Sequence, residues 1–410
     1  MSNSYRFSLA IAFGLVWNSV AGADCVFVNT NSDPNTVAAF EVNVDGSLTA
    51  VTGSPFATGG SGAFDAAVGS IGMSVGDSRL YVTNPSSDNV SSFDVADDCT
   101  LTVTPGSPYA VGDSPLGVES DPDGNYLYVA NFLGDTISVF SIAADGSLSE
   151  ITGSPFASPS SPFDIQFDPA GGRLFVSNDF AGSVSAYDQA ADGSITPVAG
   201  SPFAAGGFEH GLILNSDASL LYVADFGPDT ISGYSVDGAG ALSALAGSPF
   251  AATVEPIELI LTPDDGFLFA TNDNAENIAG FSVDGAGALI PLAGSPFASD
   301  SVGPAGLAIN PAGSFLYVAN GGFSGNPDVS VFSVAGDGSL SAISGSPFAT
   351  GGTGNATGII YMSDSLPLPL PPPPVPVPVP VLTMSLWSLI ALVGALVLLG
   401  SYRSRRATAL

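Results

Sequence analysis

Short apolar runs separated by turn residues recur along this chain. Between residues 113 and 156 the apolar or alternating runs are Leu116–Ser120, Leu127–Ala130, Thr136–Ile142 and Leu148–Thr152. Asp-Pro-Asp-Gly follows the first run, and an Asp-Gly pair, which favours a tight hairpin, follows the third. No long segment has the 3.6-residue periodicity of an amphipathic helix. The pattern predicts units of four antiparallel strands, called A to D below.

The sequence GSPF, once written GSPY, marks the end of each unit. Its copies are spaced by 47 to 53 residues and begin at Gly53, Gly106, Gly153, Gly200, Gly247, Gly294 and Gly345. The run for strand B also occurs seven times. Four-stranded units with a period near 47 residues are typical of β-propeller blades. The sequence therefore predicts an all-β, seven-bladed propeller with four antiparallel strands per blade.

The order of strands at the two ends predicts how the ring closes. The first predicted strand is a B strand at Cys25–Val28, and the last is an unaccompanied A strand at Thr357–Met362. The C-terminal strand would supply the missing inner strand of the N-terminal blade and remove two exposed sheet edges. In this arrangement Gly and Pro of GSPF end strand D, and the aromatic residue packs between adjacent blades.

The two ends of the chain have the composition of targeting segments. Residues 1–23 have one Arg, an apolar run and a terminal Ala-Gly-Ala, which predicts a signal peptide. Residues 24–363 form the predicted propeller, and residues 364–381 form a Pro-rich linker. Residues 382–410 contain an uncharged stretch, Met384–Tyr402, followed by three Arg residues, which predicts a transmembrane helix with a cytoplasmic tail. We expect an exported protein of the bacterial cell envelope, outside the cytoplasm and either anchored, released or displayed on the cell surface.

Charge narrows the range of partners. The chain has 38 acidic residues, six Arg, no Lys and one His. Only Arg79 and Arg173 lie in the predicted propeller. No basic patch is available to neutralise phosphates, so we expect no nucleic-acid partner. No cofactor is implied, although an acidic surface attracts cations and Ca²⁺ is an open alternative. We expect a monomeric propeller.

The repeats resemble two known groups. Leu80–Asn84 reads LYVTN, and Leu127–Asn131 reads LYVAN, which is similar to the YVTN repeats of surface-layer propellers and to the seven-bladed lactonase family. The better-known members of that family act on 6-phosphogluconolactone. In the stretch Gly207–Ile231, His210 and Asp225 match the family's pattern, as do Gly227 and Asp229. Phe208 and Thr230 replace a His and an Arg of that pattern, which weakens the implied affinity for an anionic substrate.

A second resemblance concerns the C-terminus. Thr383, Ser385 and Trp387 match the IPTL-type sorting signals of Gram-negative bacteria, whereas Leu382 departs from them. The resemblance implies an envelope sorting or processing enzyme as a partner. The alternative is a plain membrane anchor.

Candidate chemistry lies where the inner strands begin. Alignment of the A strands places Glu209, His210, Asp164 and Glu258 at one mouth of the central channel. His210 is a candidate general base, and Glu209, Asp164 and Asp225 are candidate catalytic carboxylates. The structural alternative is a solvated rim with one incidental His.

Two further assignments complete the candidate residues. Glu258 and Arg173 are candidate ligand-binding residues. Cys25 and Cys99 are the only cysteines, and an even pair in an exported chain predicts a disulfide bond.

Two functions remain open from the sequence. The first is an exported binding or structural module whose partner is a glycan, a cation or a surface protein. The second is a lactone hydrolase with its site at the channel mouth. The scarcity of basic residues argues against a phosphosugar lactone as the substrate and favours the first function.

Overall fold

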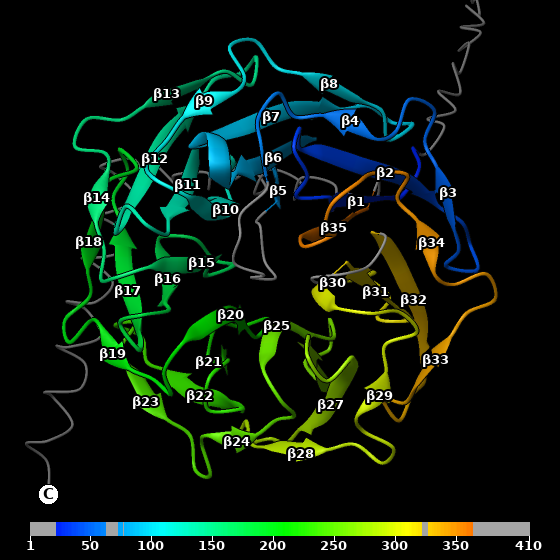
Figure 1. The fold of residues 1–410 in the computed structure, drawn as a ribbon. Coiled ribbons are helices and arrows are strands. Elements are labelled where there is room, and N and C mark those ends of the chain that lie inside the picture. The colour runs from blue at the N-terminus through cyan, green and yellow to red at the C-terminus, as the bar shows by residue number, and fades with distance from the viewer. Residues whose placement is uncertain (1–21, 63–72, 77, 322–326, 364–410) are drawn as a thin grey trace, which may run out of the picture. The chain divides into compact units, whose positions relative to one another are not determined.

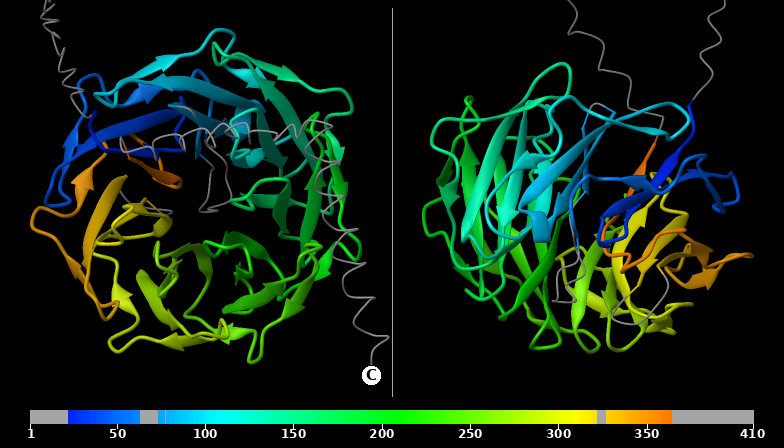
Figure 2. Two further views of the ribbon diagram at one scale, coloured as in Figure 1. Left: turned by 180° about the vertical axis from the view of Figure 1, so that it is seen from behind. Right: turned by 45° about the horizontal axis from the view of Figure 1, so that its top comes forward.

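The computed structural model describes residues 22–62, 73–76, 78–321 and 327–363. Within them, seven β-sheets form a closed ring around a central channel (Figure 1). Figure 2 shows the same ring from behind and tilted, with each sheet running from an inner strand beside the channel to the circumference. The seven-bladed propeller predicted from the sequence is confirmed.

Each blade contains four strands in meander order and a fifth, two-residue strand that pairs with the third. Blade 1 consists of β35 (Ile359–Met362), β1 (Cys25–Asn29), β2 (Thr36–Val42), β3 (Leu48–Ala50) and β4 (Phe56–Ala57). Blade 2 consists of β5 (Met73–Gly76), β6 (Arg79–Asn84), β7 (Asn89–Val95), β8 (Leu101–Val103) and β9 (Tyr109–Ala110), with one 3₁₀ turn, η1 (Pro85–Ser87). Blade 3 consists of β10 (Pro115–Ser120), β11 (Tyr126–Asn131), β12 (Thr136–Ile142), β13 (Leu148–Glu150) and β14 (Phe156–Ala157).

The remaining four blades repeat this plan. Blade 4 consists of β15 (Pro162–Phe167), β16 (Arg173–Asn178), β17 (Ser183–Gln189), β18 (Ile195–Pro197) and β19 (Phe203–Ala204). Blade 5 consists of β20 (Glu209–Leu214), β21 (Leu220–Asp225), β22 (Thr230–Val236), β23 (Leu242–Ala244) and β24 (Phe250–Ala251). Blade 6 consists of β25 (Pro256–Leu261), β26 (Phe267–Asn272), β27 (Asn277–Val283), β28 (Leu289–Pro291) and β29 (Phe297–Ala298). Blade 7 consists of β30 (Pro304–Ile309), β31 (Phe315–Asn320), β32 (Asp328–Val334), β33 (Leu340–Ala342) and β34 (Phe348–Ala349).

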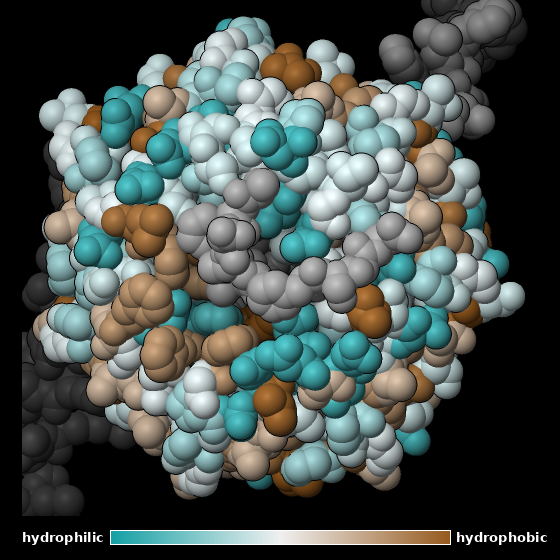
Figure 3. All heavy atoms as spheres, in the orientation of Figure 1, coloured by the Kyte–Doolittle hydropathy of each residue, from teal (hydrophilic) through white to brown (hydrophobic). Residues whose placement is uncertain are grey.

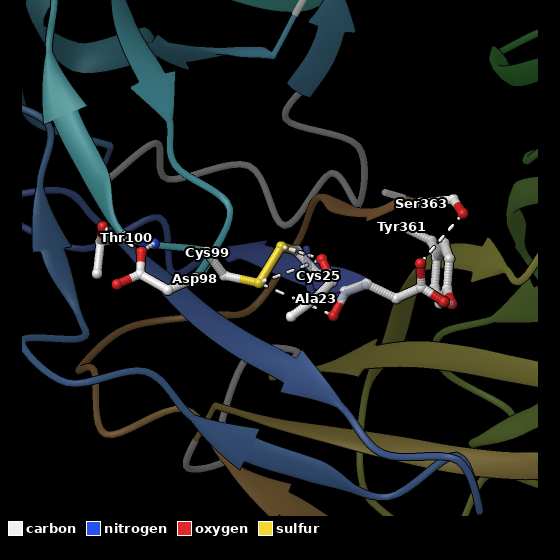
Figure 4. The surroundings of a disulfide bond; sticks show 8 residues. Ala23, Cys25, Asp98, Cys99, Thr100, Tyr361 and Ser363 are labelled. Carbon is white, nitrogen blue, oxygen red and sulfur yellow. Dashed lines mark hydrogen bonds between the residues drawn. A yellow bond between two sulfur atoms is a disulfide. The ribbon is translucent and has the colours of Figure 1, made fainter. Parts of the chain in front are cut away.

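The C-terminal strand closes the ring, as the sequence predicts. β35 pairs antiparallel with β1, so that Cys25 lies opposite Met362 and Val28 lies opposite Ile359. Side chains reinforce the pairing, because the Asp24 carboxylate accepts hydrogen bonds from Tyr361 Oη (2.6 Å) and Ser363 Oγ (3.1 Å) (Figure 4). Strand β1 is therefore held on both sides, by β35 and by β2.

A disulfide joins the first two blades. The structure has a bond between Cys25 Sγ and Cys99 Sγ, and Cys99 lies between β7 and β8 of blade 2 (Figure 4). The two residues are 74 positions apart in the chain. The bond fixes the start of β1 to the neighbouring blade.

The hydrophobic core lies between the blades. Seven of its clusters each combine residues from two adjacent sheets, for example Tyr128 of β11 with Leu174 and Val176 of β16. Each cluster includes one GSPF aromatic ring among its partly buried members, from Phe56 of blade 1 to Phe348 of blade 7. The predicted packing of this ring at the blade interfaces is confirmed.

The targeting segments predicted from the sequence lie almost entirely outside the described residues. These are the signal peptide, of which only residues 22 and 23 are described, the Pro-rich linker and the sorting signal. Within the described ranges, no helix has the length and apolar character needed to span a bilayer.

Candidate active site in the central channel

A cavity of about 210 Å³ lies in the channel, among the inner strands of six blades. Its polar side chains are Glu119 on β10, Asp164 and Gln166 on β15, and Glu258 on β25. The other lining residues are aliphatic or glycine, and they include Val118, Ile165, Leu212, Ile213, Leu259, Ile260, Gly306, Leu307, Gly358, Ile359 and Ile360. Drug-sized ligands typically occupy about 300–1,000 Å³, so this cavity suits a small molecule.

Glycines allow the inner strands to approach each other around this cavity. Gly117, Gly211 and Gly306 occupy the third position of their strands, which is also the position of Asp164 and Glu258. A Cβ atom on any of these glycines would lie closer than 3.0 Å to an atom of the next blade, namely Phe163 O, Glu258 Oε1 or Thr357 O. In blades 3 to 7 the third position therefore carries either glycine or, in blades 4 and 6, a carboxylate that lines the cavity.

Asp164 is a partly buried carboxylate that is held by the backbone. Its Oδ1 accepts a hydrogen bond from Ile165 N (2.9 Å), and its Oδ2 accepts one from Leu212 N (3.2 Å) of the next blade. Burial raises the pKa of Asp164 to about 6, and these two hydrogen bonds limit the rise. Asp164 is therefore mainly ionised at neutral pH but can accept a proton there.

Glu119 lines the same cavity as Asp164. Burial, followed by the negative charge of Asp164, raises the pKa of Glu119 well above its usual value. Gln166 Nε2 donates a hydrogen bond to Glu119 Oε1 at 3.2 Å. The cavity thus holds two carboxyl groups whose pKa values are both raised, and raised pKa values suit carboxyl groups to acid–base catalysis.

The sequence analysis missed Glu119 and Gln166. Both occupy the fifth position of their inner strands, where the corresponding residues of blades 5 to 7 are Ile213, Ile260 and Ala308. Polar residues in an otherwise apolar column would have identified them.

Glu209 and Asp225 form a separate buried group at the channel mouth. They lie opposite each other in β20 and β21, and both are fully buried. Asp225 Oδ2 accepts hydrogen bonds from Thr230 Oγ1 (2.7 Å) and Ser232 Oγ (2.8 Å), and Gly207 N donates to Glu209 Oε1. Burial, followed by the charges of Asp225 and Asp179, raises the pKa of Glu209 to about 7. The residues that line the channel cavity do not include this pair.

His210 lies between aromatic rings. The register between β20 and β21 shifts between Glu209 and Leu212, so His210 lies in a bulge. Its ring stacks on Phe163 (centroids 4.4 Å apart) and on Phe226 (4.5 Å). Burial lowers the pKa of His210 to about 3, so the imidazole is neutral and a poor base near neutral pH. The stacking favours a packing role over the general-base role expected from the sequence.

Arg173 lies far from the other candidates. It is the first residue of β16, at the end of the blade opposite the mouth, and its Nη2 is 2.8 Å from Asp188 Oδ1. Arg79 is equivalent in β6, and its Nε is 3.2 Å from Asp94 Oδ1. The structure therefore brings together Asp164 and Glu258, pairs Glu209 with Asp225, and leaves the cavity without a cation from residues 24–363.

Metal binding finds no geometric support in the parts of the chain that are described. No three His, Cys, Asp or Glu side chains there are arranged to hold a metal ion.

Comparisons with known proteins agree with this architecture. The model of the family described as "Lactonase, 7-bladed beta-propeller" matches residues 68–154, 119–298 and 158–351. No curated protein sequence matches the chain. A putative 6-phosphogluconolactonase from Bacteroides fragilis is 18% identical with a TM-score of 0.69, over 83% of this chain and 98% of that one.

Two further solved structures share the fold. A periplasmic gluconolactonase from Pseudomonas aeruginosa is 18% identical with a TM-score of 0.66, over 83% of this chain and 99% of that one. A protein from Lactobacillus plantarum is 17% identical with a TM-score of 0.68, over 83% and 100% of the two chains. The family match and the described ring together show that this chain belongs to the seven-bladed β-propeller lactonase family.

Proposed function

We propose that this protein hydrolyses a small, uncharged lactone in the channel cavity. The observation that carries the proposal is that Asp164 and Glu119, two carboxyl groups whose pKa values are raised by burial, line one cavity of about 210 Å³. Membership of the lactonase family supports a hydrolase more than a purely structural or binding module.

The reaction adds one water molecule across the ring ester. Asp164 takes a proton from water, and the water oxygen attacks the carbonyl carbon to give a tetrahedral intermediate. Glu119 donates its proton to the ring oxygen as the bond between that oxygen and the carbonyl carbon breaks. The product is a hydroxy acid, and transfer of a proton from Asp164 to Glu119 through solvent restores both groups.

The absence of basic side chains near the cavity favours an uncharged substrate. The only two Arg residues of the propeller are in ion pairs away from the cavity, so nothing in residues 24–363 compensates a phosphate there. An uncharged lactone enters without electrostatic cost. The carboxylate product, in contrast, is repelled by Asp164 and by the acidic surface, which favours its release.

The test is turnover of neutral and phosphorylated lactones by the purified full-length protein, with and without Ca²⁺. We expect turnover of neutral lactones, with kcat/KM rising as the pH increases through about 6 because Asp164 must be ionised. Asp164→Asn should lower kcat/KM by roughly 100-fold or more, and Glu119→Gln should also lower it. Asp123→Asn, at an exposed turn of blade 3, is the matched control.

Other outcomes would reassign the site or reject the function. If Glu209→Gln or His210→Ala abolishes turnover while Asp164→Asn does not, the chemistry belongs to the channel mouth. The absence of turnover with all lactones would contradict the proposal and favour a module that binds a glycan or a surface protein.

We also propose that the protein is exported and acts in the cell envelope. The predicted signal peptide supports export, and so does the Cys25–Cys99 disulfide, because such bonds persist mainly in oxidising compartments. Anchoring by the C-terminal segment and recognition by a sorting enzyme are part of this proposal. Fractionation of cells that produce the full chain tests it, and a protein found only in the cytoplasm would contradict it.

A further inference from the structure

A continuous series of rings lies on one side of the channel mouth. This aromatic wall consists of Phe132, Phe163, Phe180, Phe208, His210 and Phe226, all from blades 3 to 5 or the loops between their strands. Successive centroids are 4.4 to 6.2 Å apart. In Figure 3, tan and brown spheres gather beside the channel over blades 4 and 5, whereas teal spheres gather over blade 6.

The outer part of the wall is exposed to solvent. Phe180 is 63% exposed and Phe208 is 51% exposed, and their rings meet edge to face at 6.2 Å. The inner part is buried, because Phe132 and Phe163 form a cluster with Leu116. Exposed, adjacent aromatic side chains on a protein surface mark a site of interaction.

The backbone of Phe208 has a conformation that is rare for a bulky residue. Its φ is +58°, in the left-handed region that bulky residues rarely adopt. The equivalent positions in blades 3, 4 and 6 also have positive φ but carry Ser114, Ser161 and Glu255, and blade 7 has Gly303 there. Gly227 leaves space for the ring, since a Cβ there would lie closer than 3.0 Å to Phe208 Cδ2. Blade 5 therefore holds a large apolar ring where its neighbours hold a polar side chain.

The wall is adjacent to the proposed catalytic cavity. Phe163 directly precedes Asp164 in β15, and His210, which stacks on Phe163, lies two residues before Leu212 of the cavity lining. The Phe side chains of the wall offer no hydrogen-bonding group, so they suit hydrocarbon better than a hydroxylated ring. We infer that the wall binds an apolar alkyl substituent on the lactone whose ring occupies the cavity, an inference that rests on the proposed hydrolase function.

Binding of unreactive analogues tests this inference separately from catalysis. The probes are γ-lactams with alkyl chains from methyl to octyl, titrated calorimetrically into the full-length protein. We expect the affinity to rise by up to about fourfold per methylene once the chain reaches the wall. Phe208→Ser places the residue of blades 3 and 4 at this position, and Phe180→Ala removes the other exposed ring. Each should weaken octyl lactam binding by about tenfold or more and leave methyl lactam binding unchanged.

The control is Ile290→Ser, which removes a 52% exposed apolar side chain on outer strand β28. It should leave every affinity unchanged.

An affinity that is independent of chain length in the native protein overturns the inference, and so do equal losses for all chain lengths in the wall variants. If octyl lactam binds through the wall but no lactone is hydrolysed, alkyl binding by the wall is supported and the hydrolase proposal fails. If lactones are hydrolysed without any dependence on chain length, the hydrolase proposal stands and the inference about the wall fails.

Discussion

Each residue of the repeated Gly-Ser-Pro-Phe motif has its own structural role. All seven glycines have φ between 89° and 96°, which only glycine adopts without strain, and all seven Ser-Pro peptide bonds are cis. Each Ser Oγ accepts a hydrogen bond from a backbone N–H of the third strand of its blade, at 2.9 to 3.0 Å. The motif is a structural unit that fastens the outer edge of each blade.

The serine of this motif gives a prediction for stability. Ser201→Ala removes the acceptor of the Ala186 N–H, leaving a buried donor without its partner, and should lower the free energy of unfolding by about 1 kcal/mol. Urea denaturation measures this difference. Ser243→Ala, at an exposed position of β23, is the control and should change stability by less than about 0.5 kcal/mol. Equal effects of the two substitutions would show that the hydrogen bond contributes nothing.

Sequence reasoning identified this motif but not its hydrogen bonds. The seven copies predicted the number of blades because each blade must end in the same way. The serine appeared only as a turn residue, since its partner lies 15 residues earlier on another strand. For His210, the sequence suggested a base, but the ring is buried between Phe163 of β15 and Phe226, which follows β21, and burial lowers its pKa. Environments built by several strands are not visible in local patterns.

The inner strands define the channel through their third and fifth positions. A backbone carbonyl of one strand lies where a Cβ of its neighbour would be, so glycine is required wherever two strands come this close. Blades 4 and 6 instead carry Asp164 and Glu258 at the third position, where both line the cavity. Alignment of the A strands predicted that Asp164 and Glu258 lie at one mouth of the channel, but which residues share one cavity depends on the packing of adjacent blades.

Gly306 gives the test of this close approach. Gly306→Ala places a Cβ closer than 3.0 Å to the backbone oxygen of Thr357, next to the closing strand β35, and should destabilise the ring by about 2 kcal/mol. Thermal unfolding of the full-length protein measures the loss. Gly238→Ala serves as the control, because a Cβ added there would have no atom within 4 Å and its stability should stay close to that of the native protein. A tolerated Gly306→Ala would show that the strands can separate at little cost.

The complete ring depends on a single blade built from both ends of the chain. Blade 1 is not formed by one continuous segment of the chain, because β1 to β4 come from its N-terminal part and β35 comes from its C-terminal part. The sequence predicted this closure from the order of the strands alone. It also predicted the cysteine pair, whose bond adds a covalent link between blade 1 and blade 2.

Loss of the disulfide should destabilise the whole ring. The bond spans 74 residues, and a loop of this size gives roughly 4 kcal/mol of stabilisation in the chain-entropy description. The double variant Cys25→Ser, Cys99→Ser should show this decrease in the free energy of unfolding. A reductant should lower the stability of the native protein to a similar extent and leave the double variant unchanged. A native protein that is insensitive to reductant would contradict this expectation.

The antiparallel pairing of β1 and β35 has a mechanical consequence. Because Cys25 lies opposite Met362, the chain enters β1 and leaves β35 at the same end of the blade. A force that pulls these two ends apart loads one pair of residues at a time, like a zipper, instead of shearing all four pairs together. Cys25 is tethered to the second blade, so β35 is the strand that peels away. Tension on a C-terminal attachment would therefore open the propeller at its closing strand and leave the other six blades assembled.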